Sequence, residues 1–265
     1  MLRRLLIPCV FVSALVVPTA SQAQAVEMPE LVTDRPDFTE SSEVIWKGGF
    51  QFESGLSLET DGGDQERARG FAAPAALMRI GLGYRTELRL GGEGLLTEVS
   101  GGVRTSGYSD FEVGAKVKLF NQDQIGFDLA LLPIVSLPVG ADGFTSGTVD
   151  PTVKITWARE LPAGFGLTGN VNVAVMSDAV GRFTQEALSF SLGHDLFAGW
   201  GSYLEAYGFS RLERDGSSAI TFNGGVARPV GDRMQFDIEA GRGLTADAPD
   251  WFVGFGFAIR GSLRR

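Results

Sequence analysis

The residues that could do chemistry in this chain are few. One histidine, His194, is the only neutral general base available, and it lies in the stretch SLGHDLFAGW. A hydrolase needs a nucleophile and a base within reach of each other, and the sequence contains no G-x-S-x-G elbow. One histidine and one cysteine, Cys9, are also too few ligands for a zinc site. We therefore expect no catalytic residue, no metal and no cofactor.

Charged residues are the more informative group. The chain has 23 Lys and Arg against 32 Asp and Glu, a net charge of −9. This acidic balance argues against a nucleic-acid partner. The stretch TDRPDFTESS, residues 33–42, places three carboxylates around Arg35 and Pro36, just ahead of a run of alternating aromatic residues. Its role depends on the elements that follow it.

The start of the chain has the composition of a secretory signal peptide. Two arginines precede an apolar stretch, residues 5–17, and small residues lead to a cleavage site after Ala25. Cleavage there would make the net charge −11 and remove the one cysteine, so an exported chain would be stable without a disulfide. We expect residues 1–25 to be a signal peptide, 26–45 an N-terminal periplasmic segment and 46–265 the folded domain.

The folded domain alternates apolar and polar residues with the period of β-strands. In DWFVGFGFAIR, residues 250–260, large apolar side chains share one face, whereas Asp, Gly and Arg share the other. Each segment is about 10 residues long, the length that a tilted strand needs to cross a hydrocarbon core. Twelve such segments start near Gly48, Gly70, Arg85, Asp110, Gln124, Thr148, Gly164, Glu186, Gly199, Ser217, Met234 and Asp250.

The connections between these segments alternate in length. After odd-numbered segments come polar loops such as TDGGDQERAR (60–69), TEVSGGVRTSGYS (97–109) and SDAVGRFTQ (177–185), and after even-numbered ones come tight turns such as NQD. An outer-membrane barrel places short turns in the periplasm and long loops outside. The sequence therefore predicts an all-β fold, an antiparallel up-and-down transmembrane β-barrel of about 12 strands. A soluble antiparallel protein with one wet face is the alternative.

The tryptophans favour the membrane interpretation. Trp46, Trp157 and Trp200 fall at strand ends on the periplasmic side, and Trp251 falls at the outer side. Interfacial aromatic residues form two such girdles around outer-membrane barrels.

If the apolar faces meet lipid, the charged faces line the lumen. A lysine that faced lipid near the midplane would cost about 2–4 kcal/mol. Twelve strands enclose a lumen between a filled eight-stranded barrel and an open porin, and we expect it to be filled or plugged rather than freely open. The candidates for the lumen and solute path are Glu53, Arg85, Glu87, Arg89, Glu112, Lys116, Lys118, Lys154, Asp237 and Glu239.

The segment ahead of the first strand could enter this lumen. Pro36 makes it a poor strand. Its charges could pair with Lys116, Lys118 or Glu87 if the segment folds back into the barrel mouth. The expected N-terminal plug motif is Asp34, Arg35, Pro36 and Asp37. A disordered periplasmic leader is the alternative.

The stretches TDRPDFTESS, GGFQFESGLSLE and MRIGLGYRTELRLGGEG resemble the phenol-degradation MetA-pathway family of outer-membrane proteins. The similarity covers most of the mature chain and is strongest over residues 31–95. It implies an outer-membrane barrel and passage of small hydrophobic or aromatic compounds. The motif positions add Arg79 to the lumen candidates; they are Thr33, Asp34, Arg35, Pro36, Asp37, Thr39, Glu40, Arg79, Glu87 and Arg89.

We therefore expect an exported outer-membrane transporter or channel, not an enzyme. Its partners would be the lipid bilayer and a small-molecule solute, and the sequence gives no oligomeric state. Two alternatives stay open. One is a barrel hydrolase of the lipase type, with His194 as its base, and the other is a structural barrel without transport activity.

Overall fold

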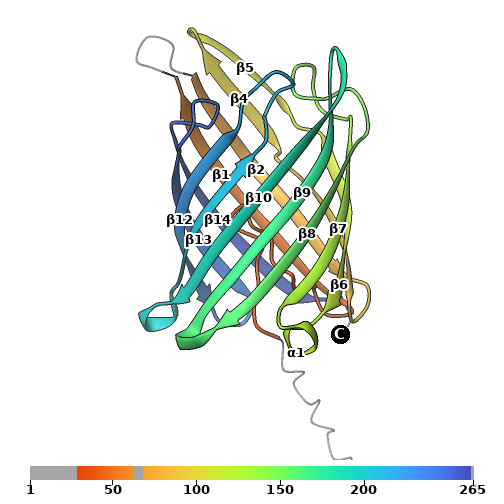
Figure 1. The fold of residues 1–265 in the computed structure, drawn as a ribbon, viewed down its shortest axis with the longest axis vertical. Helices are drawn as coiled ribbons and strands as arrows, with labels where there is room; N and C mark the ends of the chain where they lie inside the picture. Colours follow the sequence, from red (N-terminus) through yellow and green to blue (C-terminus); the bar gives the residue numbers. More distant parts are fainter. Residues whose placement is uncertain (1–28, 63–67, 264–265) are drawn as a thin grey trace, which may run out of the picture.

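The computed structural model describes residues 29–62 and 68–263, and its strands form one antiparallel sheet that closes on itself (Figure 1). The signal peptide expected over 1–25 lies outside these residues. A short helix, α1 (Gln122–Ile125), and two 3-10 turns, Pro162–Gly164 and Phe197–Gly199, connect strands at the lower end. In the described residues no helix is long and apolar enough to cross a membrane. The strands are β1 (Gly49–Asp61), β2 (Ala68–Gly81), β3 (Thr86–Gly92), β4 (Leu95–Ser100), β5 (Val103–Tyr108), β6 (Phe111–Phe120), β7 (Asp128–Leu137), β8 (Asp150–Leu161), β9 (Phe165–Asp178), β10 (Gly181–Asp195), β11 (Gly201–Phe209), β12 (Ala219–Val230), β13 (Met234–Gly243) and β14 (Trp251–Ser262).

These strands fill twelve positions around the barrel. Strands β3 and β4 both pair with β2, one after the other, and together they occupy one position. Strands β6 and β5 pair with β3 and β4 in turn and occupy the next position. Strand β1 pairs with both β2 and β14, which closes the ring. The predicted antiparallel up-and-down barrel of twelve strands is confirmed.

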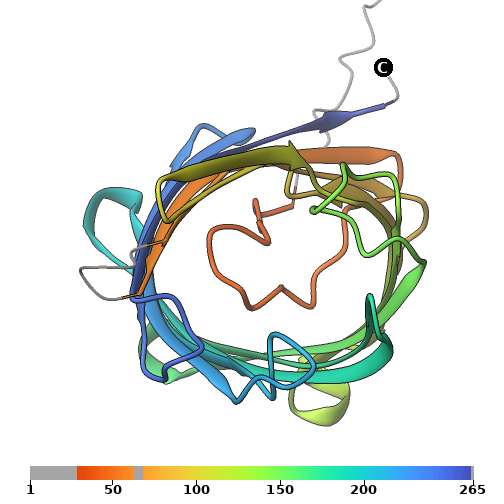
Figure 2. The ribbon, with the colours of Figure 1, turned by 90° about the horizontal axis from the view of Figure 1, so that it is seen from above.

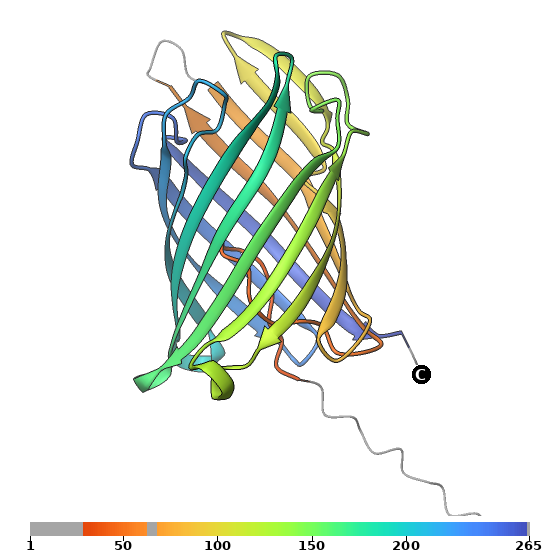
Figure 3. The same ribbon diagram turned by 45° about the vertical axis from the view of Figure 1, so that its right-hand side comes forward.

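The upper loops differ from the expectation in two places. The stretches 97–109 and 177–185, expected as long polar loops, mostly form extensions of the hairpins β4–β5 and β9–β10. These hairpin ends lie beyond the apolar band, where both faces meet water, so polar side chains suit them. The backbone hydrogen bonds between the strands form whatever the side chains are. Long loops remain at 138–149, 210–218 and 244–250, all at the end of the barrel opposite α1 (Figure 3).

The barrel is apolar outside and charged inside. Leu188, Phe190, Leu204 and Ile238 are each more than half exposed on strands of the outer wall. The largest fully buried side chains include Arg79, Lys116, Gln51, Glu53 and Glu87. This is the inverse of a soluble protein, whose charged side chains lie mostly at the surface. The ladder closes around the ring, and in the described residues β5, at the upper end, is the one strand that pairs with a single neighbour. A closed ladder is the condition for a sheet to sit in lipid.

Trp157, Trp200 and Trp251 lie on the outer wall, as residues of an aromatic girdle should, and Trp46 does not. Trp157 packs edge-on against Phe190 on the outer wall, with ring centroids 6.0 Å apart. Trp46 instead lies inside the lower mouth, where the guanidinium of Arg260 sits 5.5 Å from its ring centroid. The reason is local: the backbone at residues 45–46 crosses directly over Gly81, which has no side chain to block it.

Candidate functional site

Residues 29–48, here called the N-terminal segment, form an irregular loop inside the barrel. Seen from above, the segment winds through the middle of the lumen (Figure 2). It rises from the lower end and returns there to join β1 (Figure 3). Because it is not a strand, its backbone N–H and C=O groups need partners from the lumen wall.

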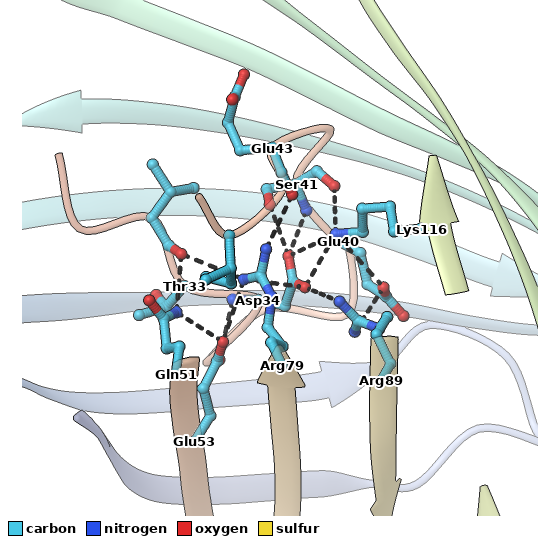
Figure 4. A network of polar contacts seen from close by, with 12 residues as sticks. Thr33, Asp34, Glu40, Ser41, Glu43, Gln51, Glu53, Arg79, Arg89 and Lys116 are labelled. Atoms are coloured by element: carbon cyan, nitrogen blue, oxygen red, sulfur yellow. Dashed lines mark hydrogen bonds and ion pairs between the residues drawn. The ribbon is translucent and has the colours of Figure 1, made fainter. Parts of the chain in front are cut away.

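Asp34 is the centre of the contacts that hold the segment (Figure 4). Its carboxylate lies 3.2 Å from Arg79 Nη1 and 3.0 Å from Lys116 Nζ, and it also pairs with Arg89. The Ser41 N–H donates to its other oxygen at 2.8 Å. Burial alone would raise the pKa of Asp34, but the three cations hold it well below its ordinary value.

Two further carboxylates of the segment face positively charged side chains on the lumen wall. Glu40 lies 2.9 Å from Arg89 Nη2 and 2.5 Å from Lys154 Nζ. Burial opposes ionisation of Glu40, yet these cations lower its pKa to about 2. Glu43 pairs with Lys118 nearer the lower end. The segment therefore places negative charge beside the Arg and Lys side chains of β2, β3, β6 and β8.

Wall carboxylates in turn accept hydrogen bonds from the backbone of the segment. Glu53 Oε2 accepts from the N–H groups of Asp34 and Arg35 at 2.9 and 3.0 Å. Glu87 Oε2 accepts from the Ile45 N–H at 2.8 Å. Hydrogen bonds to a charged acceptor are about twice as strong as neutral ones, so these contacts fix the path of the loop.

Glu205 on β11 does the same at the far side of the lumen. Its two oxygens accept from the N–H groups of Phe38 and Thr39, at 3.0 and 2.6 Å. The Phe38 ring stacks on Tyr207 with centroids 4.6 Å apart. Burial, together with the neighbouring Glu205, raises the pKa of Asp37 well above its ordinary value.

Arg35 reaches the wall in a different direction from Asp34. Its guanidinium lies 3.5 Å from Asp237 on β13. On the way it passes over Gly55 of β1 and Gly256 of β14, where a Cβ atom would come within 2.4 Å of it. Glycine at both positions is what lets the side chain lie flat on the wall.

The segment separates two cavities. The upper one has a volume of about 450 Å³ and is lined by Arg89, Lys154 and Phe144 among others. The lower one, of about 270 Å³, is lined by residues that include Asp37 and Tyr203. Arg35 lines both cavities, so it lies at the partition between them.

Most of the sequence-predicted lumen residues meet at the segment. Glu112 lines the upper cavity, and Glu239 accepts from the Tyr203 hydroxyl at 3.3 Å. Arg85 does not line the lumen: it is exposed in the turn before Thr86, where β3 begins, and its guanidinium donates to the Leu119 carbonyl at 2.9 Å. Those that contact the segment are Glu53, Arg79, Glu87, Arg89, Lys116, Lys118, Lys154 and Asp237.

Glu205 is the main residue that the sequence pattern does not single out. Its strand also carries Tyr203 and Tyr207 toward the lumen, so the inner face does not look polar. The available signal is its position: Glu205 stands between Leu204 and Ala206, which are both exposed on the outer wall.

The structure places His194 away from the charged residues of the lumen. It lies on the outer wall near the lower end of β10, with its ring 4.3 Å from that of Phe165. The hydroxyl of Ser202 donates to the backbone carbonyl of His194 at 3.0 Å. Within residues 29–62 and 68–263, no group of three or more His, Cys, Asp or Glu side chains could hold a metal ion.

Several solved structures have a similar fold. An outer-membrane channel from Pseudomonas putida F1 superposes with a TM-score of 0.64 at 12% identity, covering 83% of this chain and 98% of that one. The NanC porin gives 0.51 at 8% identity, covering 79% and 98%. The translocator domain of the autotransporter NalP from Neisseria meningitidis gives 0.51 at 9% identity, covering 80% and 88%. At these identities the similarity establishes the fold alone.

Comparison of the sequence itself gives a family. No curated protein sequence matches the chain significantly. The family model described as "Putative MetA-pathway of phenol degradation" matches residues 33–261, from the first residue of TDRPDFTESS to the last strand. The match spans both the barrel and the part of the N-terminal segment that fills it, and the chain therefore belongs to this family.

Proposed function

We propose that this barrel spans the outer membrane and conducts small solutes, with the N-terminal segment as a plug that must move before a solute can pass. The observation that carries the proposal is the position of the segment between cavities of about 450 and 270 Å³. A structural barrel has no need of two lumen cavities. The short turns and the segment would face the periplasm, as is usual for outer-membrane barrels.

The proposed solutes are small hydrophobic or aromatic compounds. The family description, which refers to phenol degradation, supports this class. The upper cavity also supports it, because Leu96, Ile134 and Phe144 offer an apolar surface beside the charges of Arg89 and Lys154. A solute with an apolar body and a polar group would contact both.

Conductance in planar lipid bilayers tests the proposal. The mature chain should be closed for most of the time, and a variant lacking residues 29–45 should show discrete, sustained openings. Migration on gels with and without boiling would show that both forms are folded barrels. Electrical silence of both folded forms would overturn the proposal.

A further inference from the structure

The loop of residues 138–149, between β7 and β8, is here called the inward loop. Seen from above, this green loop bends in over the lumen (Figure 2). The backbone N–H groups of Gly140 and Ser146 donate to the two carboxylate oxygens of Asp110 at 2.9 and 3.1 Å. The N–H of Ala141 donates to the Tyr108 carbonyl at 2.9 Å. The inward loop is therefore fastened to the junction between β5 and β6, above the upper cavity.

Phe144 is the large apolar side chain that the inward loop brings to the upper cavity. It is half-buried and lines the cavity. Its ring lies over the buried Gly107 of β5, where a Cβ atom would come within 2.4 Å of the ring. Because position 107 is glycine, the ring can lie against the lumen wall. The outer end of the cavity thus offers an aromatic ring to a solute.

The cavity wall on β2, β3, β6 and β7 is apolar and has two glycines. Gly91 pairs with Leu77, and Gly114 pairs with Ile134. All four residues line the cavity. A Cβ atom at Gly114 would lie 3.0 Å from the Ile134 side chain, and one at Gly91 would lie 3.4 Å from that of Leu77. Glycine within a strand often marks a place where a ligand approaches closely, and these two leave room for a planar ring.

The charged groups that line the upper cavity favour a solute without negative charge. Its three cations, Arg35, Arg89 and Lys154, each lie within 3.5 Å of a carboxylate of the segment or the wall. Its carboxylates are Glu40, Glu53, Glu93, Asp110 and Glu112. In the described residues, Glu93 and Glu112 accept no hydrogen bond and pair with no cation. They can accept from a hydroxyl group of a solute, and they repel an anion.

We propose that the upper cavity binds uncharged aromatic solutes that carry a hydroxyl group, with Phe144 as the residue that selects an aromatic ring. This inference rests on the proposed function and narrows its substrate class. The solute ring contacts Phe144 and the wall at Gly91 and Gly114, and its hydroxyl donates to Glu93 or Glu112. The volume of about 450 Å³ suits this role, since small-molecule sites enclose about 300–1,000 Å³.

The site is complete while the plug is docked, because the cavity lies above the segment. Binding to the wild-type protein can therefore be measured without any conductance. Titrations of the detergent-solubilised mature protein, followed by saturation-transfer NMR at pH 7, give dissociation constants for benzyl alcohol, cyclohexylmethanol and benzoate. Heat-dependent gel migration shows that each protein is folded.

We expect benzyl alcohol to bind about two- to tenfold more tightly than cyclohexylmethanol, the fold-change that corresponds to about 0.5–1.5 kcal/mol for an aromatic pair. Cyclohexylmethanol has the larger apolar surface, so unspecific binding or partition into detergent would give the opposite order. Benzoate should bind more weakly than benzyl alcohol, because Glu93 and Glu112 repel its carboxylate.

Two variants assign these preferences to named residues. Phe144→Leu keeps an apolar side chain and removes the ring, so the preference for benzyl alcohol over cyclohexylmethanol should disappear. Phe111→Leu, at a site 41% exposed on β6 and outside the cavity, is the matched control and should retain the preference. Glu112→Gln should narrow the difference between benzyl alcohol and benzoate, whereas Glu213→Gln, in the exposed loop 210–218, should not.

The outcomes separate this inference from the proposed function. Tighter binding of cyclohexylmethanol, a preference that survives Phe144→Leu, or no binding of benzyl alcohol to the folded protein would overturn the inference. Openings of the Asp34→Asn variant in planar bilayers would then still support the channel. The predicted order of binding, found in a barrel that is electrically silent in every form, would support the site and overturn the proposed function.

Discussion

Replacing Asp34 by Asn removes one negative charge from the point where the plug is held most tightly. The Asp34 side chain is 2% exposed and pairs with three wall cations, Arg79, Arg89 and Lys116. The amide keeps the size of the side chain, and its oxygen can still accept from Ser41. Breaking a buried ion pair by removing one partner costs about 3–5 kcal/mol, and each 1.4 kcal/mol is about a factor of ten in an equilibrium constant. The ratio of docked to undocked plug should therefore fall by a factor of about 100 to several thousand.

The open probability of single channels in planar bilayers measures this ratio. We expect the Asp34→Asn variant to open frequently under conditions in which the wild-type protein is almost always closed. Asp142→Asn, in an exposed upper loop, is the control for a change of one charge unit. If Asp34→Asn protein is folded, as judged by its heat-dependent gel migration, and still opens no more often than this control, the ion pairs do not hold the plug.

Three further changes test other parts of the account. Glu205→Gln weakens the acceptor for Phe38 and Thr39; because hydrogen bonds to charged groups contribute about 1.5–3 kcal/mol, open probability should rise by about tenfold or more, and an unchanged value in bilayer recordings would contradict this role. Lowering the pH from about 4.5 toward 2 should open the wild-type channel, because docking depresses the pKa of Asp34 and lowers that of Glu40 from 4.5 to about 2; docking raises the pKa of Asp37, so protonation of that group favours the docked plug and does not contribute to opening. The stabilisation from these two carboxylates is complete above their undocked pKa values and is lost as the pH falls from about 4.5 toward 2, so conductance titrations that show no opening in that range would refute it. Ile238→Lys places a charge on the outer wall, where Ile238 is 54% exposed; at a cost of about 2–4 kcal/mol near the midplane, refolding yield into lipid should drop relative to Asp142→Lys, and equal yields would show that this wall does not face lipid.

The barrel could be predicted from the sequence because its strands carry a simple alternation. Strand β14 is an example: its outward positions are Trp251, Val253, Phe255, Phe257 and Ile259, and its inward ones include Gly254, Gly256, Ala258 and Arg260. The residues that face the lumen cannot be predicted from the sequence as easily. In β11 the inward positions combine Tyr203 and Tyr207 with Glu205, so hydrophobicity does not separate the faces there.

The N-terminal segment shows where sequence reasoning stops for a physical reason. The charges of TDRPDFTESS and the position of Pro36 indicate a segment that avoids strand structure and has ionic partners. Which partners it has depends on contacts between residues far apart in the chain, such as Thr39 with Ser189. Local periodicity carries no information on such pairs. Arg85 is the opposite case, since a shift of one residue in the start of β3 moves it from the lumen to a turn.

The central claim is that the N-terminal segment closes the lumen, and a reversible cross-link tests it most directly. Thr39 and Ser189 have hydroxyl oxygens 2.7 Å apart, and residues 26–265 contain no cysteine. Thr39→Cys and Ser189→Cys, introduced together with Asp34→Asn, should form a disulfide that ties the plug to β10. The account predicts that the oxidised protein is silent in planar bilayers and that reduction by dithiothreitol restores the frequent openings of Asp34→Asn. Openings of equal frequency before and after reduction, with the disulfide shown to be formed, would contradict it.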